Sequence, residues 1–360
     1  MGYFSALETC AENASGFYAT CTFMAAHKGR STTSAGCAQR AQELQPERQT
    51  MGKLNRREFI AGIAGLGAAF LAGGCSGKEA ADVRPATNRP PKFDPKTLAV
   101  AKGDDPAKNT RGAINALGGL GKLIRKGDFV VVKPNMAWNR APTQAATTNP
   151  EVIAEIVRLC FAAGAGKVLV IDHIIDRPAE TVLSFNGIGP AAEKAGAKAV
   201  AAQNESDYRS VSIPQGKMLK SDTCLKDILK ADVFINVPIA KDHGATRLTL
   251  GMKNLMGCNY DRQAWHRSSS LDQCIADYAS AIRPDLVVLD ATRILLDNGP
   301  KGPGKTKDVN QVIAGVDQVA VDAYGARLFG IKPSDIGYIK CAAAMGIGEI
   351  DLSKIVIKSA

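Results

Sequence analysis

Lysine, asparagine and histidine side chains recur just after short apolar runs of this 360-residue chain. Together, these residue types can attract a carboxylate or phosphate and move protons on it. A lysine held out of water beside another cation has a lowered pKa and can act as a base or nucleophile, and histidine exchanges protons near neutral pH. The candidate catalytic residues are therefore Lys241, His243, Lys253 and His266, and the candidate ligand-binding residues are Lys133, Asn135, Asn254, Asp290 and Asn298. An alternative stays open, in which the lysines are solvated and the asparagines cap turns.

These candidates lie within a regular alternation of strand-like and helical segments. Apolar runs at 98–101, 129–132, 168–171, 233–237, 286–289 and 312–314 predict strands, and the segments 150–163, 221–230, 271–281, 318–329 and 333–344 predict helices. The alternation predicts an α/β fold over residues 97–360, with a largely parallel or mixed sheet flanked by helices, in one core or two lobes. Ligands gather outside the carboxyl ends of parallel strands, so the candidates are expected to meet there.

Several short motifs follow one another along this domain. The first is Lys-Pro-Asn at 133–135. The second, at 235–243, begins with Ile-Asn-Val-Pro and ends with Lys241 and His243. The third, at 248–257, begins with Leu-Thr and contains Lys253 and Asn254, and the fourth is Trp-His at 265–266. Asp290, Asn-Gly-Pro at 298–300 and a helix at 317–323 come next. In this order the motifs resemble domain-of-unknown-function family 362, from about residue 97 to 357. The family is best known on chains that also bear iron–sulfur ferredoxin modules, so the resemblance implies a redox- or cofactor-associated role and a redox partner protein.

The cysteines do not supply a ferredoxin motif in this chain. A bacterial ferredoxin segment needs four cysteines in a tight C-x-x-C-x-x-C-x-x-x-C run, and the spacing here is far wider. Cys160 lies in an apolar helical segment and is expected in the core. Cys224, Cys258 and Cys274 could converge in space, so they are the candidate ligands of a metal or an iron–sulfur cluster. The cofactor is therefore left unassigned.

The segment 299–306, Gly-Pro-Lys-Gly-Pro-Gly-Lys-Thr, fits the written pattern of a phosphate-binding P-loop, but we reject that function. A P-loop binds phosphate through successive backbone N–H groups, and a helix begins directly after its threonine. Pro300 and Pro303 each remove an N–H donor, and the following residues lead into a predicted strand. We expect a mobile basic loop beside the pocket instead.

Residues 51–75 have the features of an export signal. The pair Arg56-Arg57 precedes an apolar run at 59–72, which is shorter than the about 20 residues of a membrane span. This order resembles a twin-arginine (Tat) signal and implies passage through the Tat translocon in folded form. Cys75 follows Leu-Ala-Gly-Gly, so we expect a lipid on Cys75 to anchor the protein to the membrane. Cleavage without a lipid and an uncleaved anchor are the alternatives.

The position of the predicted signal determines how the residues before and after it are interpreted. A signal works near an amino terminus, so we expect translation to start at Met51 and residues 1–50 to be a mis-assigned or disordered extension. Residues 76–96 contain Pro85, Pro90 and Pro91 and are expected to form a flexible linker. These features predict a periplasmic or cell-envelope protein.

The charge of the chain narrows the class of ligand. It carries 45 basic and 35 acidic residues, a net charge of +10, with both signs interspersed and no nucleic-acid-binding motif. Nucleic acid is therefore excluded as a partner, whereas a pocket for a small anion suits the charge. Two function classes stay open. One is an enzyme or redox-maturation factor that acts on a small anionic compound. The other is a non-catalytic periplasmic accessory protein that carries an anion, a metal or an iron–sulfur cluster for a partner.

Overall fold

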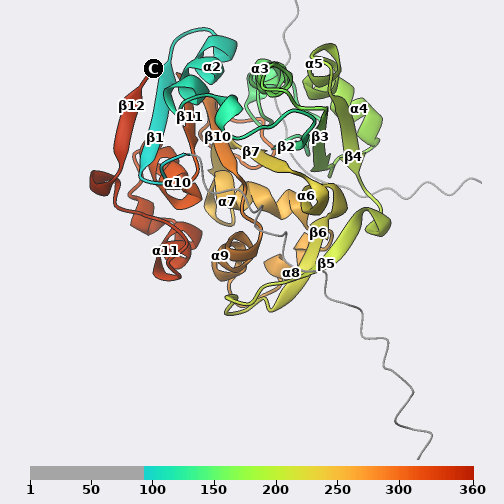
Figure 1. The fold of residues 1–360 in the computed structure, drawn as a ribbon. Coiled ribbons are helices and arrows are strands. Elements are labelled where there is room, and N and C mark those ends of the chain that lie inside the picture. The colour runs from blue at the N-terminus through green and yellow to red at the C-terminus, as the bar shows by residue number, and fades with distance from the viewer. Residues whose placement is uncertain (1–92) are drawn as a thin grey trace, which may run out of the picture. The chain divides into compact units, whose positions relative to one another are not determined.

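A mixed β-sheet forms the centre of residues 93–360, which are the residues that the computed structural model describes (Figure 1). Its strands are β1 (Thr97–Lys102), β2 (Phe129–Pro134), β3 (Lys167–His173), β4 (Lys198–Ala202), β7 (Val233–Val237), β8 (Ile239–His243), β9 (Arg247–Thr249), β10 (Leu286–Leu295), β11 (Thr306–Gly315) and β12 (Val356–Ser359). Across the sheet the order is β12-β1-β11-β10-β7-β2-β3-β4, with β8 beside β10 and β9 beside β8. The predictions for residues 1–50 and 51–75, and for 76–92 of the linker, lie outside the described residues.

The helices of this region are α2 (Pro106–Ala116), α3 (Pro150–Ala162), α4 (Ala179–Phe185), α5 (Ile188–Lys194), α6 (Lys226–Lys230), α7 (Gly251–Asn254), α8 (Arg262–His266), α9 (Leu271–Ala281), α10 (Gln318–Arg327) and α11 (Gly337–Ala344). Asn149 caps α3 as predicted, since its side chain accepts the N–H of Glu151 and Pro150 occupies the first turn. Asp317 caps α10 by accepting the N–H groups of Val319 and Ala320. Within residues 93–360, no helix is both long and apolar enough to cross a membrane.

The central strands are parallel, and this brings their carboxyl ends to one edge. β2 pairs in parallel with both β3 and β7, and β7 pairs in parallel with β10. In this register Lys133 at the end of β2 is opposite Asn236 in β7. β11 runs antiparallel to β1 and β10, so the sheet is mixed. The predicted α/β fold with a largely parallel or mixed sheet is therefore confirmed.

Alternate side chains of the central strands pack into two apolar layers, one on each face of the sheet. Val130 and Val132 of β2 pack against α2, α3 and α5, whereas Val131 of β2 and Phe234 of β7 pack with α9, α10 and α11. Figure 1 shows these two groups of helices on opposite sides of the sheet. Because successive side chains of a strand point to opposite faces, a short apolar run can supply both layers. Residues 93–360 are built around this large sheet, with a small separate two-stranded sheet beside it, and form one compact unit rather than two lobes.

One predicted helix is partly wrong. Residues 221–230 do not form a single helix, because β6 (Ser221–Leu225) occupies the first half and α6 only the second. β6 pairs antiparallel with β5 (Tyr208–Ser212), with Tyr208 opposite Leu225. Cys224 and Leu225 are buried and continue the apolar layer beneath. Pairing with the preceding strand, β5, therefore overrides the preference of the segment for a helix.

Candidate functional site

A cavity of about 690 Å³ lies at the ends of β2, β3 and β8 and is also lined by α7 and α8. Seven of the residues predicted from the sequence line it, namely Lys133, Asn135, Lys241, His243, Lys253, Asn254 and His266. They come from segments that are far apart in the sequence but share one edge of the sheet. The topology of the parallel strands therefore accounts for their meeting.

The short helical turn α7 is fixed to its surroundings through its backbone. The carboxylate of Asp322, on α10, accepts the N–H of Gly251 at 2.6 Å and that of Met252 at 2.9 Å. The Asn236 side chain donates to the carbonyl of Gly251 at 2.9 Å. A turn of four residues has little helical stability of its own, so these bonds determine where Lys253 and Asn254 lie.

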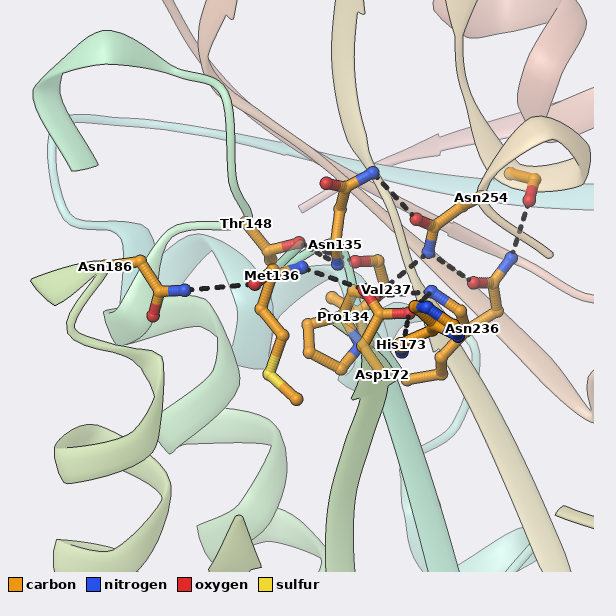
Figure 2. Close-up of polar contacts among 12 residues, drawn as sticks. Pro134, Asn135, Met136, Thr148, Asp172, His173, Asn186, Asn236, Val237 and Asn254 are labelled. Atoms are coloured by element: carbon orange, nitrogen blue, oxygen red, sulfur yellow. Dashed lines mark hydrogen bonds and ion pairs between the residues drawn. The ribbon is translucent and has the colours of Figure 1, made fainter. Parts of the chain in front are cut away.

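Three asparagines form a directed row of hydrogen bonds along one wall (Figure 2). Lys241 Nζ donates to Asn135 Oδ1 at 3.2 Å, and Asn135 Nδ2 donates to Asn254 Oδ1 at 3.0 Å. Asn254 Nδ2 then donates to Asn236 Oδ1 at 2.9 Å. Each amide therefore accepts at its oxygen from the preceding side chain and donates from its nitrogen to the next, and the row ends where Asn236 donates to the carbonyl of Gly251.

Lys133 and Asp172 form a buried ion pair at the base of the cavity. The distance from Lys133 Nζ to Asp172 Oδ1 is 2.7 Å, and the side chains are only 1% and 3% exposed. Asp172 also accepts the backbone N–H groups of Met136 and His173. Gly257 lies directly against the pair, and a Cβ at this position would collide with Asp172 Oδ1. The charge of Lys133 is therefore neutralised by the protein itself.

Lys241 and Lys253 differ from Lys133, because neither has a carboxylate within ion-pair distance among residues 93–360. Both are buried. Burial, followed by the charge of Lys253, holds the pKa of Lys241 well below its usual range. Burial and then the charge of Arg262 lower the pKa of Lys253 to about 7. The cavity therefore contains two amines that have lost water without gaining a counter-charge.

Three histidines line the cavity; His173 is buried and hydrogen-bonded to the Tyr208 hydroxyl, and the other two, His243 and His266, are suited to different tasks. Nδ1 of His243 accepts the backbone N–H of Ala245 at 3.1 Å, so the proton of the neutral ring is on Nε2. Burial and the nearby charges of Lys253 and Lys241 lower the pKa of His243 to about 2, which makes it a hydrogen-bond donor rather than a base. The ring of His266 stacks on it at 6.4 Å between centroids. Burial lowers the pKa of His266 as well, although this side chain is more accessible.

The structure does not bring Asp290 and Asn298 to the cavity. Asp290 is buried in β10, and its carboxylate accepts the N–H of Asn149 at 2.7 Å and both the N–H and the hydroxyl of Thr292. It therefore fixes the start of α3 and the irregular part of β10. The Asn298 side chain donates to the carbonyl of Pro303 within its own loop.

The loop that fits the P-loop pattern ends in a strand, because Thr306 is the first residue of β11. No helix follows it to direct N–H groups at a phosphate, which agrees with the rejection from sequence. Lys301 of this loop pairs with Asp176 at 2.8 Å and lies over the ring of Trp138. Pro300 is the residue of the loop that lines the cavity.

Comparison with known proteins places the chain in a family. Residues 130–327 match the family model described as a domain of unknown function, DUF362. The chain belongs to the DUF362 family. Over 244 residues it is 29% identical to a thylakoid-associated protein of Synechocystis sp. (strain ATCC 27184 / PCC 6803 / Kazusa), a match that covers 66% of this chain and 74% of that protein.

Two solved structures resemble this DUF362 protein more distantly. The lactate racemase apoprotein from Thermoanaerobacterium thermosaccharolyticum is 13% identical with a TM-score of 0.42, and the match covers 66% of this chain and 58% of that chain. A protein from Thermotoga maritima is 11% identical with a TM-score of 0.37, and the match covers 68% and 60%. The DUF362 protein therefore spans less than two thirds of the length of either structure.

The cysteines of this DUF362 protein do not form the metal site that the sequence allowed. Cys224, Cys258 and Cys274 are buried and not in disulfides. In the part of the chain that the structure describes, no three histidine, cysteine or carboxylate side chains lie close enough together to hold a metal ion. Burial raises the pKa of Cys258 and of Cys274, so both are protonated thiols when no metal is present. These residues therefore do not fit an iron–sulfur cluster.

Sequence reasoning missed Arg262 and Asn236 as residues of the site. Arg262 is half-buried at the start of α8 and lines the cavity. Trp265 holds this helix in place, because it is buried and donates to Asp222 at 2.6 Å. The Trp-His motif was a signal that the helix is part of the site, and it could have drawn attention to the arginine beside it. Asn236 belongs to the Ile-Asn-Val-Pro motif. Because it lies inside a predicted strand and not after its end, the sequence did not indicate that it is part of the site.

Proposed function

We propose that this DUF362 protein is an enzyme that binds a small anionic compound in the cavity and transfers protons on it. The observation that carries the proposal is the pair of buried lysines, Lys241 and Lys253, without a carboxylate partner among the described residues. A buried cation without a counter-charge is unfavourable, and a bound carboxylate or phosphate would supply that charge. Arg262 and Arg177 line the same cavity and add further positive charge to it.

The side chains around the two lysines support acid–base chemistry. With a pKa of about 7, Lys253 can take up or release a proton at neutral pH. His266 is the accessible histidine of the cavity and can exchange protons with solvent. His243 stays neutral and can donate Nε2–H to an oxygen of the ligand. These roles favour an enzyme over a simple anion carrier.

Replacing Lys241 with methionine tests the anion site. We expect the affinity for inorganic phosphate or propionate to fall about 10- to 100-fold, because a hydrogen bond to a charged group contributes roughly 1.5–3 kcal/mol. The free energy of unfolding should change by less than about 1 kcal/mol, since relief of the repulsion from Lys253 opposes the loss of two hydrogen bonds. Isothermal titration calorimetry and urea unfolding measure the two quantities.

Lys305→Ala is the matched control, because Lys305 is an exposed lysine of the loop at 299–306 and does not line the cavity. Its replacement should leave the affinity within about 2-fold, as expected for a charge that only steers the ligand. The reverse ranking, with Lys305 essential and Lys241 neutral, would show that phosphate binds at the loop and that the P-loop was rejected wrongly.

We also propose that the Tat translocon exports the protein and that a lipid on Cys75 anchors it at the membrane in the periplasm or cell envelope. Changing Arg56 and Arg57 together to lysine should keep the protein in the cytoplasm without altering its unfolding midpoint, while Arg84→Lys in the predicted linker should have no effect. Cell fractionation measures the location. Normal export of the double variant would exclude the Tat route, and Cys75→Ala should separately release the protein from the membrane.

A further inference from the structure

We propose that Lys253 forms an imine with its substrate, and that the substrate is a small oxo acid whose carbonyl group lies beside a carboxylate. This inference rests on the proposed function, because it requires that an anion enters the cavity. It adds a covalent step and a chemical class of substrate.

The first argument comes from the partners of the three cavity lysines, which differ. Lys133 is paired with the Asp172 carboxylate at 2.7 Å, and Lys241 donates to two oxygens, Asn135 Oδ1 and the carbonyl of Ala146. Lys253 Nζ donates to the sulfur of Met256 at 3.0 Å, and no oxygen acceptor contacts it among residues 93–360. A thioether is a weak acceptor. Among the described residues, Lys253 is therefore the cavity lysine whose nitrogen is not held by an oxygen acceptor and can turn toward a ligand.

The second argument is the surrounding charge. The groups that act on Lys253 are Arg262 of α8, which disfavours the ammonium form, and Asp272 of α9, which favours it. The charge of Lys253 in turn lowers the pKa values of Lys241, His243 and His266. Burial and Arg262 outweigh Asp272, so a large fraction of Lys253 is the neutral amine at neutral pH. A desolvated lysine beside another cation is the usual form of an imine-forming residue.

The third argument is position. Asp322 and Asn236 fix α7 through three backbone hydrogen bonds, so the amine of Lys253 is presented from a rigid turn. Lys241 and Arg262 remain available to hold a carboxylate in the same cavity. A carboxylate attached directly to a carbonyl carbon can occupy this cationic region while its carbonyl meets the amine. This arrangement favours an oxo acid over an anion that lacks a carbonyl group.

The step requires no oxidant or reductant. The neutral nitrogen of Lys253 attacks the carbonyl carbon, a C–N bond forms, and one proton passes from the nitrogen to the carbonyl oxygen to give a carbinolamine. A nearby acid then protonates the hydroxyl group, the C–O bond breaks and water leaves, and the nitrogen returns its remaining proton to that acid so that a neutral C=N bond remains. His266 can supply and recover that proton, and His243 can donate a hydrogen bond to the departing oxygen.

Reductive trapping of the full-length protein tests the proposal. Pyruvate is added with sodium cyanoborohydride, and intact-mass and peptide-mass analysis then locate any adduct. We expect one reduced adduct per chain, on the peptide that contains Lys253. The adduct should disappear in Lys253→Met and in Lys253→Arg, the second of which keeps a charged side chain of similar length. The exposed Lys305 reports unspecific labelling and should stay unmodified.

Binding without reductant separates this inference from the proposed function. Propionate has the carboxylate of pyruvate but no carbonyl group, and calorimetry measures its binding directly. If propionate and pyruvate both bind and no adduct is trapped, the imine is overturned while the anion site stands. If neither of them binds, the proposed function fails and the imine fails with it. An adduct on Lys133 or Lys241 would also overturn the assignment to Lys253.

Discussion

Replacing Asp172 with alanine is expected to lower the free energy of unfolding by about 3–5 kcal/mol, the usual effect of removing one partner of a buried ion pair. The variant leaves the Lys133 ammonium group buried without its counter-charge. It also removes the acceptor of the Met136 and His173 N–H groups. Urea unfolding at neutral pH measures the loss.

Two further variants separate the causes of this loss. Asp308→Ala is the matched control, because Asp308 pairs with Arg293 at the surface and an exposed pair contributes about 0.2–1 kcal/mol. Adding Lys133→Met to Asp172→Ala should recover the part of the loss that comes from the uncompensated charge. If the double variant is no more stable than Asp172→Ala, the lost N–H bonds and not the charge dominate.

The second large effect is expected at Asp322. Asp322→Ala should lower the free energy of unfolding by about 2–5 kcal/mol at pH 5, because two buried N–H groups lose their acceptor and each such loss costs about 1–3 kcal/mol. Asp351→Ala is the control, since Asp351 accepts the N–H of Ser353 at the surface. Its effect should stay at about 1 kcal/mol or less.

The effect of Asp322→Ala should also depend on pH. Burial raises the pKa of Asp322 from its ordinary value of 3.8 to about 7, so the folded protein binds this proton more tightly than the unfolded chain does. The contribution of Asp322 to stability is therefore fully present below about pH 4 and falls as the pH rises toward 7. The difference between wild type and variant should shrink from pH 5 to pH 8. A growing difference would mean that the two N–H bonds outweigh burial and favour the carboxylate.

The candidate site could be predicted from sequence where a local signal marks a strand end. Lys133 and Asn135 follow an apolar run directly, and parallel pairing brings such ends together. Lys241 and His243 proved to lie within a strand of their own, β8, which pairs with β9 before α7 begins. The sequence therefore predicted that these side chains meet at one edge of the sheet. It did not predict β8, the strand in which Lys241 and His243 lie.

The errors arise where long-range contacts decide the role of a side chain. An aspartate after a strand looks the same in sequence whether it faces a ligand or accepts backbone N–H groups, as Asp290 does. The sequence around Arg262 does not predict that this side chain lines the cavity, because α8 reaches the ends of β2 and β3 only in the folded protein. Similarly, β6 is a strand because β5 pairs with it. Sequence patterns indicate the periodicity of apolar residues along the chain. The role of a side chain depends on which other groups folding brings into contact with it.

The directed row of asparagine side chains has a consequence for how tightly a ligand can bind. Asn135, Asn254 and Asn236 are each restrained at both the oxygen and the nitrogen of the amide. Reversing any one of them would set donor against donor and acceptor against acceptor along the row. The side-chain entropy of this wall is therefore lost during folding, before any ligand is present. Because the wall is preorganised, a ligand that contacts it loses no binding free energy to ordering these amides.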